Sequence, residues 1–538
     1  MKRIVIGSTF AFLAGVFLIS ACLEKNDPPA VDEPEVLTAE DSLIVSYVEK
    51  FNADDYQMYV QAFSNVAAAD FMRENIPVFE CPDKELEKTW YFRWWTFRKH
   101  IKQTVDGYVI TEFLPEVSWA GKHNAICCPA MHHFVEGRWL RDDTYLNDYA
   151  RHWCRYKNDA KTYSFPSAYS YLEFYKVHQN QQLLSETYED LKVLYNRWYD
   201  RRWDEAAGMF WQYDGADGME VSISGGLSSD DSGYRATINS YMYADAIALA
   251  HIASMLGYTG DQEYYLSEAD KIASIVNDRL WDESARFYKV IPRFGNMSFS
   301  PARELHGYVP WMFGIPGADR NDAWLQLADP QGFKAPYGPT TAEQRADGFK
   351  VVYSGHECQW NGPSWPFATA QTLTALARTL HRDGESSYIT KETYFETLQT
   401  YSNSHRRVNE IGQKVCWIDE NLDPFTGEWL ARKMLLRRSD YKYVERGKDY
   451  NHSSFCDLII SGLMGVQPQL DGSIVIEPLL PEGEWDWFSL SRLYCAGKEI
   501  SLVYDRTGKH YGGEPGLTVY VDGKKAAHSD TYASRIVL

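Results

Sequence analysis

Carboxylates, glycines and aromatic residues gather between residues 202 and 245. Asp217 and Glu220 stand there close to Trp211 and Tyr213, and glycines at 215, 218, 225, 226 and 233 predict a loop. Aromatic rings can cover the apolar faces of a pyranose, and a carboxyl group can transfer a proton at a glycosidic oxygen. The pattern favours sugar chemistry. An acidic surface loop followed by an amphipathic helix is the alternative.

Other stretches carry the same mixture of aromatic, basic and acidic side chains. They are residues 93–95 (RWW), 119–124 (WAGKHN), 132–139 (HHFVEGRW), 359–367 (QWNGPSWPF) and 417–427 (WIDENLDPFTG). The candidate sugar-binding side chains are Arg93, Trp94, Trp95, Trp119, Lys122, His132, Glu136, Arg138, Tyr213, Asn239, Tyr241, Trp360, Asn361 and Trp365. We expect Trp360, Trp365, Trp94 and Arg93 to line one cavity.

Each candidate has a structural alternative. Trp360 and Trp365 could belong to the core, and Arg93, Lys122 and Arg138 could form buried salt bridges. His132 and His133 cannot both face a pocket if they lie on a helix, so one of them is expected to be structural. Asp419, beside Glu420, is typical of a turn or capping residue.

The elements that must position these residues are mainly helical. Amphipathic patterns predict helices over residues 39–72, 79–102, 129–140, 143–157, 165–178 and 183–200, and helix pairs over 300–328, 364–382 and 388–405. Residues 108–121 look β-like, and residues 203–210 (WDEAAGMF) are echoed by 281–287 (WDESARF). Repeated helical hairpins without a solenoid consensus predict a closed double ring of helices, an (α/α)6 barrel.

From about residue 466 the pattern changes to alternating, β-branched runs, with Asp522-Gly523 as a hairpin signal. The predicted organisation is a leader over 1–21, a tether over 22–38, an (α/α)6 catalytic domain over 39–465 and a small C-terminal β-domain over 466–538.

The composition of the chain limits the classes of protein to which it can belong. Hydrophobic residues make up 45% and charged residues 24% of the 538, which is typical of a globular protein. The net charge of −20 argues against nucleic acid as a partner, because phosphate binding needs clustered Lys and Arg. The cysteines form no C-x-x-C pair and the histidines no H-E-x-x-H motif, so we expect neither a disulfide scaffold nor a metal or other cofactor.

The N-terminus reads as a targeting segment. Lys2 and Arg3 precede an apolar run that ends in Ile19-Ser20-Ala21-Cys22, which resembles a bacterial lipobox. Lipidation of Cys22 would anchor the protein in the bacterial envelope, at the outer membrane, on its periplasmic face or at the cell surface. The lipid anchor is the only membrane contact expected. The oligomeric state stays open.

Three of these motifs together resemble a known family. Residues 360–366 (WNGPSWP) look like the W-x-G-P-x-W-P signature of glycoside hydrolase family 63 and the related mannosylglycerate hydrolases. Residues 420–427 (ENLDPFTG) are similar to the turn that carries that family's catalytic base, and residues 218–222 (GMEVS) resemble the element that carries its acid. The resemblance implies a six-hairpin glycosidase toroid, with Glu220 as general acid, Glu420 as general base and an α-linked substrate. Glu220 stands where the family has Asp, so Asp217 is the alternative acid.

The chemistry of an inverting glycosidase fits this pair. One protonated carboxyl group and one carboxylate flank the bond, about 6.5–9.5 Å apart, and a closed ring can bring residues 220 and 420 to one rim. Burial among Trp and Tyr would keep the acid protonated. The resulting hypothesis is a lipid-anchored inverting glycoside hydrolase with a carbohydrate substrate. A non-catalytic glycan-binding lipoprotein and a polysaccharide lyase on a helical toroid are the alternatives.

Overall fold

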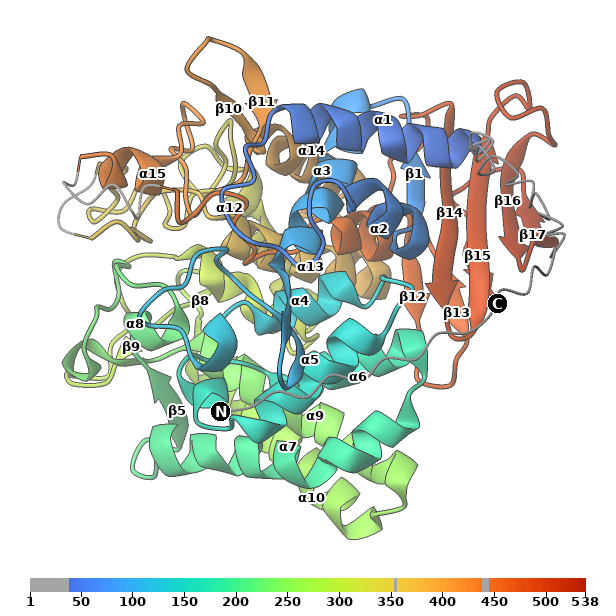
Figure 1. Cartoon of the computed structure of the whole chain (residues 1–538). Coiled ribbons are helices and arrows are strands. Elements are labelled where there is room, and N and C mark those ends of the chain that lie inside the picture. The colour runs from blue at the N-terminus through green and yellow to red at the C-terminus, as the bar shows by residue number, and fades with distance from the viewer. Residues whose placement is uncertain (1–37, 353–355, 438–444) are drawn as a thin grey trace, which may run out of the picture.

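Helices in two layers form the body of the molecule (Figure 1). The structure is a computed structural model that describes residues 38–352, 356–437 and 445–538. Within those ranges, six helical segments make up the inner layer, each in contact with the next. They are α4 (Ala130–Gly137), α6 (Ser167–His178), α9 (Ala236–Leu256), α11 (Val309–Met312), α13 (Pro366–Asp383) and the π-helical segment η7 (Leu458–Leu463).

An outer helix precedes each inner one along the chain. The outer helices are α3 (Lys84–His100), α5 (Thr144–Arg155), α7 (Gln181–Arg202), α10 (Thr259–Arg279), α12 (Leu325–Ala328) and α14 (Lys391–Ser404). Helices α1 (Ala39–Ala53) and α2 (Ala68–Asn75) cover α3, which buries nearly its whole length. The mainly helical (α/α)6 architecture predicted from the repeated hairpins is therefore confirmed.

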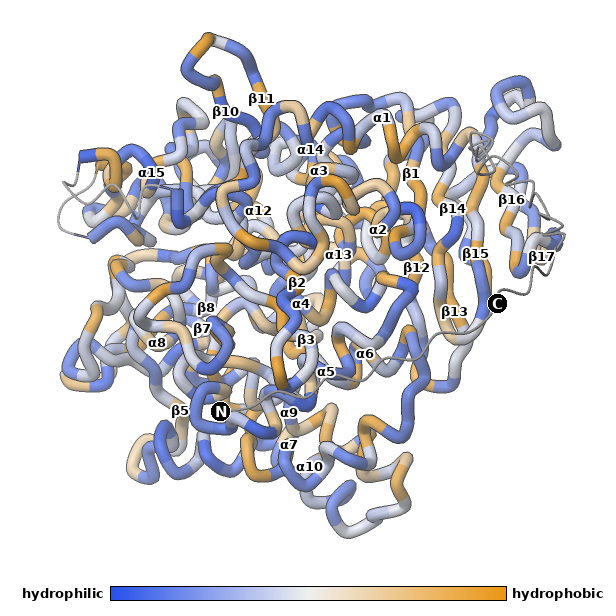
Figure 2. Tube along the Cα trace, in the orientation of Figure 1, coloured by the Kyte–Doolittle hydropathy of each residue, from blue (hydrophilic) through white to orange (hydrophobic). Residues whose placement is uncertain are grey.

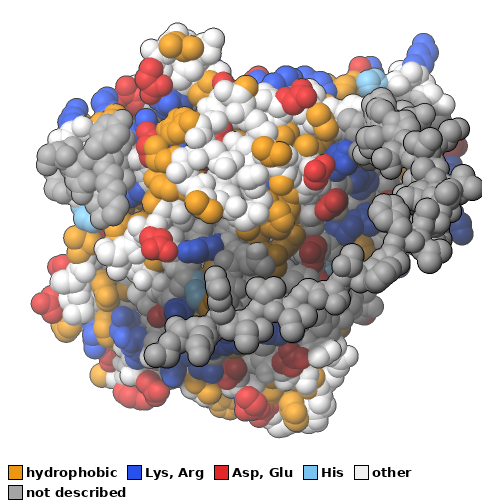
Figure 3. Space-filling view, in the orientation of Figure 1, with side chains coloured by type: hydrophobic (Ala, Val, Ile, Leu, Met, Phe, Trp, Pro, Cys, Tyr) orange, Lys and Arg blue, Asp and Glu red, His pale blue; other side chains and the backbone are white. Residues whose placement is uncertain are grey.

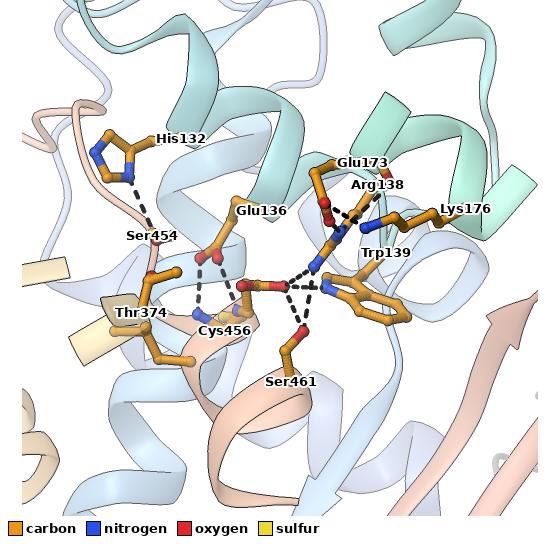
Figure 4. Close-up of polar contacts among 12 residues, drawn as sticks. His132, Glu136, Arg138, Trp139, Glu173, Lys176, Thr374, Ser454, Cys456 and Ser461 are labelled. Carbon is orange, nitrogen blue, oxygen red and sulfur yellow. Dashed lines mark hydrogen bonds and ion pairs between the residues drawn. The ribbon is translucent and has the colours of Figure 1, made fainter. Parts of the chain in front are cut away.

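A buried carboxylate closes the inner ring. Glu136 on α4 accepts the backbone N–H groups of Phe455, Cys456 and Asp457, which lead into η7, at 2.8–3.1 Å. Figure 4 shows Glu136 reaching across to Cys456. These N–H groups have no acceptor within their own helix, so a carboxylate at this point satisfies them and binds the last inner segment to the first.

The outer helices are amphipathic at the helical period. In α7 the buried residues are Leu183, Leu184, Thr187, Tyr188, Leu191, Leu194, Tyr195 and Trp198. Figure 2 shows hydrophilic and hydrophobic residues alternating along α7 and α10. This stripe packs against the inner layer, while the other face is polar and meets solvent.

The C-terminal part is built from strands, and one strand of the body joins it. The main antiparallel sheet has the order β1 (Val78–Glu80), β14 (Trp487–Cys495), β15 (Lys498–Asp505), β16 (Gly516–Val521), β17 (Lys524–Ser529). Asp522 and Gly523, both with positive φ, form the predicted turn between β16 and β17. A smaller sheet combines β12 (Val466–Pro468), β13 (Ile474–Ile476) and β18 (Ile536–Val537).

Short strands and helices connect the two layers. The strands are β2 (Ile101–Thr104), β3 (Gly107–Ile110), β4 (Trp203–Asp204), β5 (Met209–Gln212), β6 (Gly233–Tyr234), β7 (Trp281–Asp282), β8 (Phe287–Tyr288), β9 (Ile291–Pro292), β10 (Arg406–Val408) and β11 (Lys414–Cys416). The remaining α-helices are α8 (Asp214–Asp217) and α15 (Leu430–Leu435), and 3₁₀ turns lie at η1 (Lys122–Asn124), η2 (Asp159–Lys161), η3 (Ser229–Asp231), η4 (Leu305–Tyr308) and η5 (Ala318–Trp324). The echoed WDE sequences both begin short hairpins, β4–β5 and β7–β8.

Two predicted helical regions differ from the structure. The helix expected over 39–72 is split, because α1 ends at Ala53 and α2 begins at Ala68. The pair expected over 300–328 consists of η4, α11, η5 and α12, all short. Pro310, Gly314, Pro316 and Gly317 interrupt that region and prevent longer helices.

Parts of the N-terminal prediction lie outside the described residues. They include the leader, Cys22 and the tether up to residue 37. Among the residues that are described, no helix is long and apolar enough to cross a membrane. The eight cysteines of that part of the chain are free thiols.

Candidate active site

A cavity of about 270 Å³ lies where the inner helices begin. Its walls come mainly from the loops that precede α4, α6, α9, α13 and η7. The lining residues are Glu112, Phe113, Trp119, Ile126, Cys128, Tyr163, Gly215, Gly218, Glu220, Leu227, His356, Glu357, Cys358, Trp360, Trp365, Phe367, Glu420, Arg446, Tyr450 and His452. Three carboxylates far apart in the sequence, Glu112, Glu220 and Glu420, therefore share one cavity.

Backbone hydrogen bonds hold three motif loops together. The N–H of Trp360 donates to the carbonyl of Val221 at 2.7 Å, which links the Trp signature to the acidic loop. Ser364 and Leu422 exchange two hydrogen bonds of 2.9 and 3.0 Å, which link the same signature to the turn carrying Glu420. A Cβ at Gly362 would lie 2.1 Å from the Lys350 carbonyl oxygen, so the signature requires glycine there.

Glu420 is held as an ion pair. Arg446 donates to its two carboxylate oxygens from Nε at 2.7 Å and Nη2 at 3.2 Å. The Cys358 thiol donates to Oε2 at 3.4 Å. The fork of a guanidinium matches a carboxylate, and two parallel bonds fix its orientation as well as its charge. Glu420 is thus positioned as a carboxylate at the cavity wall.

Glu220 has a different environment. Its Oε2 is buried and meets no hydrogen-bond donor in the part of the chain that the structure describes. Burial raises the pKa of Glu220 to about 8, and the nearby charge of Glu420 acts in the same direction. The raised pKa favours the protonated form of Glu220 near neutral pH, whereas Glu420 forms an ion pair with Arg446. Two carboxyl groups in such different surroundings in one cavity can serve as acid and base.

Glu112 is a third carboxyl group that the sequence did not single out. It follows β3 in the segment predicted to be β-like, and it accepts the hydroxyl proton of Tyr450 in a short hydrogen bond. Burial raises the pKa of Glu112 to about 8, partly offset by the Tyr450 hydrogen bond. Nothing in the motif around it (TEFLP) distinguishes it from a buried core acid.

The two tryptophans of the signature stack on each other. The rings of Trp360 and Trp365 are 4.4 Å apart at an interplanar angle of 13°. The Trp365 indole donates to the Gln359 carbonyl at 2.7 Å, whereas the Trp360 Nε1 is buried and meets no acceptor among the described residues. Both rings line the cavity, and the Trp360 side chain is close enough to Glu220 to act on the pKa of that carboxyl group.

Trp119 and Leu227 mark the open side of the cavity. Trp119 is 40% exposed, and the Arg446 guanidinium lies 5.3 Å from its ring centroid. Leu227, from the acidic loop, is 52% exposed. Trp119 was among the expected sugar-binding residues and lines the cavity.

Arg446, Tyr450 and His452 also line the cavity and were missed by sequence reasoning. The ring nitrogens of His452 are buried and have no hydrogen-bond partner within the described ranges. Burial lowers the pKa of His452 well below its usual value, so the ring is neutral. The polar and aromatic run YNHSS at 450–454 is the local signal that could have pointed to Tyr450 and His452.

Asp217, the alternative acid, is committed elsewhere. Arg235 Nε lies 3.1 Å from its Oδ2, and Thr237 donates its hydroxyl proton to the same oxygen in a short hydrogen bond. Asn239 and Tyr241, on α9, are also bound within the protein. Asn239 pairs with the backbone of Phe210 at 2.9 and 3.1 Å, and the Tyr241 hydroxyl accepts from Gln371 at 2.7 Å.

The expectation that Arg93 and Trp94 line this cavity is wrong. Arg93 donates to His405 and Tyr401 at 3.0 and 3.2 Å and to the Ser453 carbonyl, because α3 belongs to the outer layer. Trp94 is fully buried against Trp90 and Phe97. Trp95 donates to Asn52 on α1 at 2.9 Å. These three side chains therefore have structural roles, although Arg93 is bound by hydrogen bonds rather than by the buried salt bridge that was the alternative.

His132 and Glu136 on α4 and Arg138 just after it are outside the cavity lining, and Figure 4 shows the polar contacts that they make instead. His132 is within 3.4 Å of the Ser454 hydroxyl, and Glu136 closes the ring. Arg138 forms ion pairs with Glu173 at 2.5 Å and Asp457 at 2.9 Å, near the other end of the inner helices. These placements follow from a helix that runs down the barrel wall, so only its start can reach the cavity.

Lys122, Tyr213 and Asn361 are neighbours of the cavity outside its lining. The Lys122 backbone N–H donates to Asp159 at 2.8 Å, and Asn361 donates to the Gly348 carbonyl at 3.4 Å. The Tyr213 ring packs against Gly215, which does line the cavity. Asp419 accepts the Glu420 N–H at 2.8 Å, as a turn residue does.

Comparison with known proteins assigns the family. The model of the mannosylglycerate hydrolase MGH1-like glycoside hydrolase domain matches residues 122–453, well over half of the chain. The match includes Glu220, Glu420 and both signature tryptophans. The chain belongs to this family of glycoside hydrolase domains.

Solved structures agree with the fold. A protein named "Sialidase" shares 38% identity over 93% of this chain, with a TM-score of 0.85. This chain spans 44% of that protein's length. The GH78 family rhamnosidase of Bacillus sp. GL1 (13% identity, 83% of this chain and 41% of that one, TM-score 0.53) and the α-L-rhamnosidase of Dictyoglomus thermophilum (15%, 80% and 43%, TM-score 0.50) share the fold alone.

Proposed function

We propose that the protein hydrolyses a glycosidic bond with inversion at the anomeric carbon. Glu220 donates its proton to the leaving oxygen as the bond to the anomeric carbon breaks. Glu420 takes a proton from a water molecule that attacks the opposite face. The observation that carries this proposal is that one cavity holds Glu220, whose pKa is raised by burial, and Glu420, which is bound by Arg446.

The signature tryptophans and Arg446 have supporting roles in this proposal. The stacked Trp360 and Trp365 offer an apolar wall, which suits the apolar face of a sugar ring. Arg446 holds the base in one orientation. The proposed α-linkage rests on the resemblance of residues 420–427 to the family's base turn.

Replacing the base tests the mechanism. Glu420→Gln should lower kcat by about 10²–10⁴-fold, because removing a general base typically costs that much, and sugar binding should persist. Glu428→Gln is the matched control, since Glu428 lies in the same segment, is exposed and pairs with Lys433 at 2.6 Å. Equal activity of the two variants would contradict the role of Glu420.

The stereochemistry of the product tests inversion. NMR of the first-formed sugar should show the anomer opposite to that of the substrate, and azide should not restore a retained product to Glu420→Gln. A retained anomer would indicate a covalent intermediate. A lyase would leave an unsaturated sugar, so the release of reducing ends without such a product would exclude a lyase. A panel of α- and β-linked aryl glycosides and disaccharides would define the sugar and the linkage that the protein cleaves.

A further inference from the structure

Five cations gather beside the open side of the cavity. They are Lys161 at the end of η2, Arg197, Arg201 and Arg202 on the last turns of α7, and Arg293 after β9. We call this set the basic rim. Figure 3 shows Lys and Arg side chains gathered at the lower left of the molecule, where Figure 1 labels β5 and α7. In a chain with a net charge of −20, such a cluster needs an explanation.

The charges of the basic rim are largely unbalanced. Arg293 pairs with Asp204 at 3.3 Å, and the other four cations make no ion pair with the residues that the structure describes. The Nη1 of Arg197 is buried and has no partner among those residues either. Burial and then the charges of Arg197 and Arg201 lower the pKa of Lys161, which places the three side chains within electrostatic reach of one another.

Aromatic rings lie among the cations. The Arg202 and Arg293 guanidinium groups lie 4.5 and 4.1 Å from the centroid of Trp211. Arg202 also lies 5.6 Å from the centroid of Tyr213. Guanidinium groups fixed on aromatic faces are pre-organised, so they lose little freedom when they bind a planar anion.

The basic rim is continuous with the cavity. Tyr213 packs against Gly215, and Lys161 stands two residues before Tyr163; both Gly215 and Tyr163 line the cavity. Leu227, the exposed lining residue, comes from the same acidic loop as Gly215. The Leu227 carbonyl and the Tyr213 ring both lie next to Gly215, and Arg202 of the basic rim lies 5.6 Å from the centroid of that Tyr213 ring.

We propose that the protein acts on a glycan that carries carboxylates, with uronic acid units bound by the basic rim while the scissile bond lies in the cavity. A guanidinium fork binds a carboxylate through two hydrogen bonds, and the Trp211 ring holds the Arg202 and Arg293 guanidinium groups in place for this contact. This inference rests on the proposed glycosidase function and names its substrate class.

Binding measurements test it without requiring turnover. The probes are short oligogalacturonides and oligoglucuronides, each paired with the same oligosaccharide after its carboxylates have been reduced to alcohols. Calorimetry with the full chain should show the acid forms binding about tenfold or more tighter than the reduced forms. That preference should shrink as salt is raised, because exposed charges are screened.

Charge-reversal variants test whether the basic rim causes the tighter binding of the acid forms. Arg201→Glu on α7 should abolish this preference, and so should Lys161→Glu on the separate segment η2. Lys524→Glu is the control, because Lys524 is exposed on β17 and makes the same change in net charge. Melting temperatures of all three variants identify any that do not fold. Equal affinity for acid and reduced forms, or equal losses in the three variants, would overturn the proposal.

The two proposals fail in different ways. If the protein hydrolyses neutral glycosides through Glu420 but binds both forms of each oligosaccharide equally, the substrate class is wrong and the glycosidase function stands. If it prefers the acid forms but hydrolyses no glycoside, the charge recognition stands and the catalytic proposal is wrong.

Discussion

Three glutamates in one cavity differ because their partners differ. Glu420 faces the Arg446 guanidinium, Glu112 accepts a hydrogen bond from the Tyr450 hydroxyl, and one oxygen of Glu220 is buried without a partner in the described chain. The same side chain is thus stabilised as a charged group in one place, whereas burial favours its neutral form in another. The role of each follows from its neighbours rather than from its residue type.

We predict that activity falls above pH about 8. The pKa of Glu220 is raised to about 8, and the acid must be protonated to assist the leaving group. The pH profile of kcat/KM should therefore lose about tenfold per pH unit beyond that value. In Glu220→Gln, a substrate with a good leaving group should lose this alkaline limb, because it needs little protonation.

Glu112 is a second carboxyl group that could cause the alkaline limb. The pKa of Glu112 is also raised to about 8, so Glu112 and Glu220 titrate in the same range. Glu112→Gln should keep the alkaline limb if Glu220 is the acid. If the limb disappears in Glu112→Gln and persists in Glu220→Gln, the acid role belongs to Glu112.

A stability prediction follows from the same pKa. Between the ordinary glutamate value of 4.5 and about 8, folded Glu220 holds a proton that the unfolded chain has released. Stability therefore falls as pH rises through that window, by up to about 1.4 kcal/mol per pH unit for one proton. Urea unfolding from pH 5 to 8 should show Glu220→Gln losing less stability than the wild type. A Glu428→Gln control should follow the wild type.

At the scale of elements, the site depends on loops tied across the rim and on a ring that closes. Glu136 satisfies three backbone N–H groups that lead into η7, and η7 follows directly from the segment holding Tyr450 and His452. Closing the inner layer therefore also positions one wall of the cavity. This contact between Glu136 on α4 and the backbone before η7 cannot be recognised from a local sequence pattern.

Removing this contact should destabilise the fold. Glu136→Ala leaves three buried N–H groups without an acceptor, and each costs about 1–3 kcal/mol. We expect a loss of at least about 3 kcal/mol in the free energy of unfolding, measured by urea denaturation. Glu428→Ala removes an exposed glutamate and should cost less than about 0.5 kcal/mol. A neutral Glu136→Ala would mean that water replaces the carboxylate.

Helical periodicity predicted most of the long helices, because their buried faces repeat every three or four residues, as in α7. It failed over 300–328, where prolines and glycines leave single turns. The resemblance of three motifs to a known family predicted that residues 220, 360, 365 and 420 matter, and all four line one cavity. It missed Glu112 and Arg446, because their roles arise from contacts across more than a hundred residues or from an unremarkable local sequence. Sequence reasoning misplaced Arg93, since a buried arginine that is hydrogen-bonded within the protein and a substrate-binding one have the same sequence signature.

At the scale of the whole molecule, the C-terminal strands and the helical body share one sheet. Strand β1 pairs with β14 through Val78–Ser491, Phe79–Leu490 and Glu80–Ser489. The Ala496 N–H also donates to the carbonyl of Val177 at the end of α6, at 2.7 Å. The strands after residue 466 thus complete the burial of the body.

A chain that ends at residue 465 should therefore fail to fold cooperatively. Phe79, which packs against Trp485, would lose its cover together with the hydrogen bonds of β1. Circular dichroism during heating should show no sharp transition for this fragment, whereas the full chain melts in one. A fragment with a sharp transition and glycosidase activity would show that residues 466–538 form a separable domain.

The position of the first helix bears on attachment to the membrane. Helix α1 begins at Ala39, and Thr38 caps it by accepting the Asp41 N–H at 3.1 Å, so the folded body starts where the Pro-rich segment ends. We propose that Cys22 is lipidated and that the tether over residues 22–38 attaches the body to the outer membrane.

Cys22→Ala should move the protein from the membrane fraction to the soluble fraction on cell lysis, with kcat/KM unchanged. Cys416→Ala, which removes a thiol of the folded body, should stay with the membrane. If Cys22→Ala remains in the membrane fraction with the same processing of its N-terminus, the lipid anchor is not at Cys22.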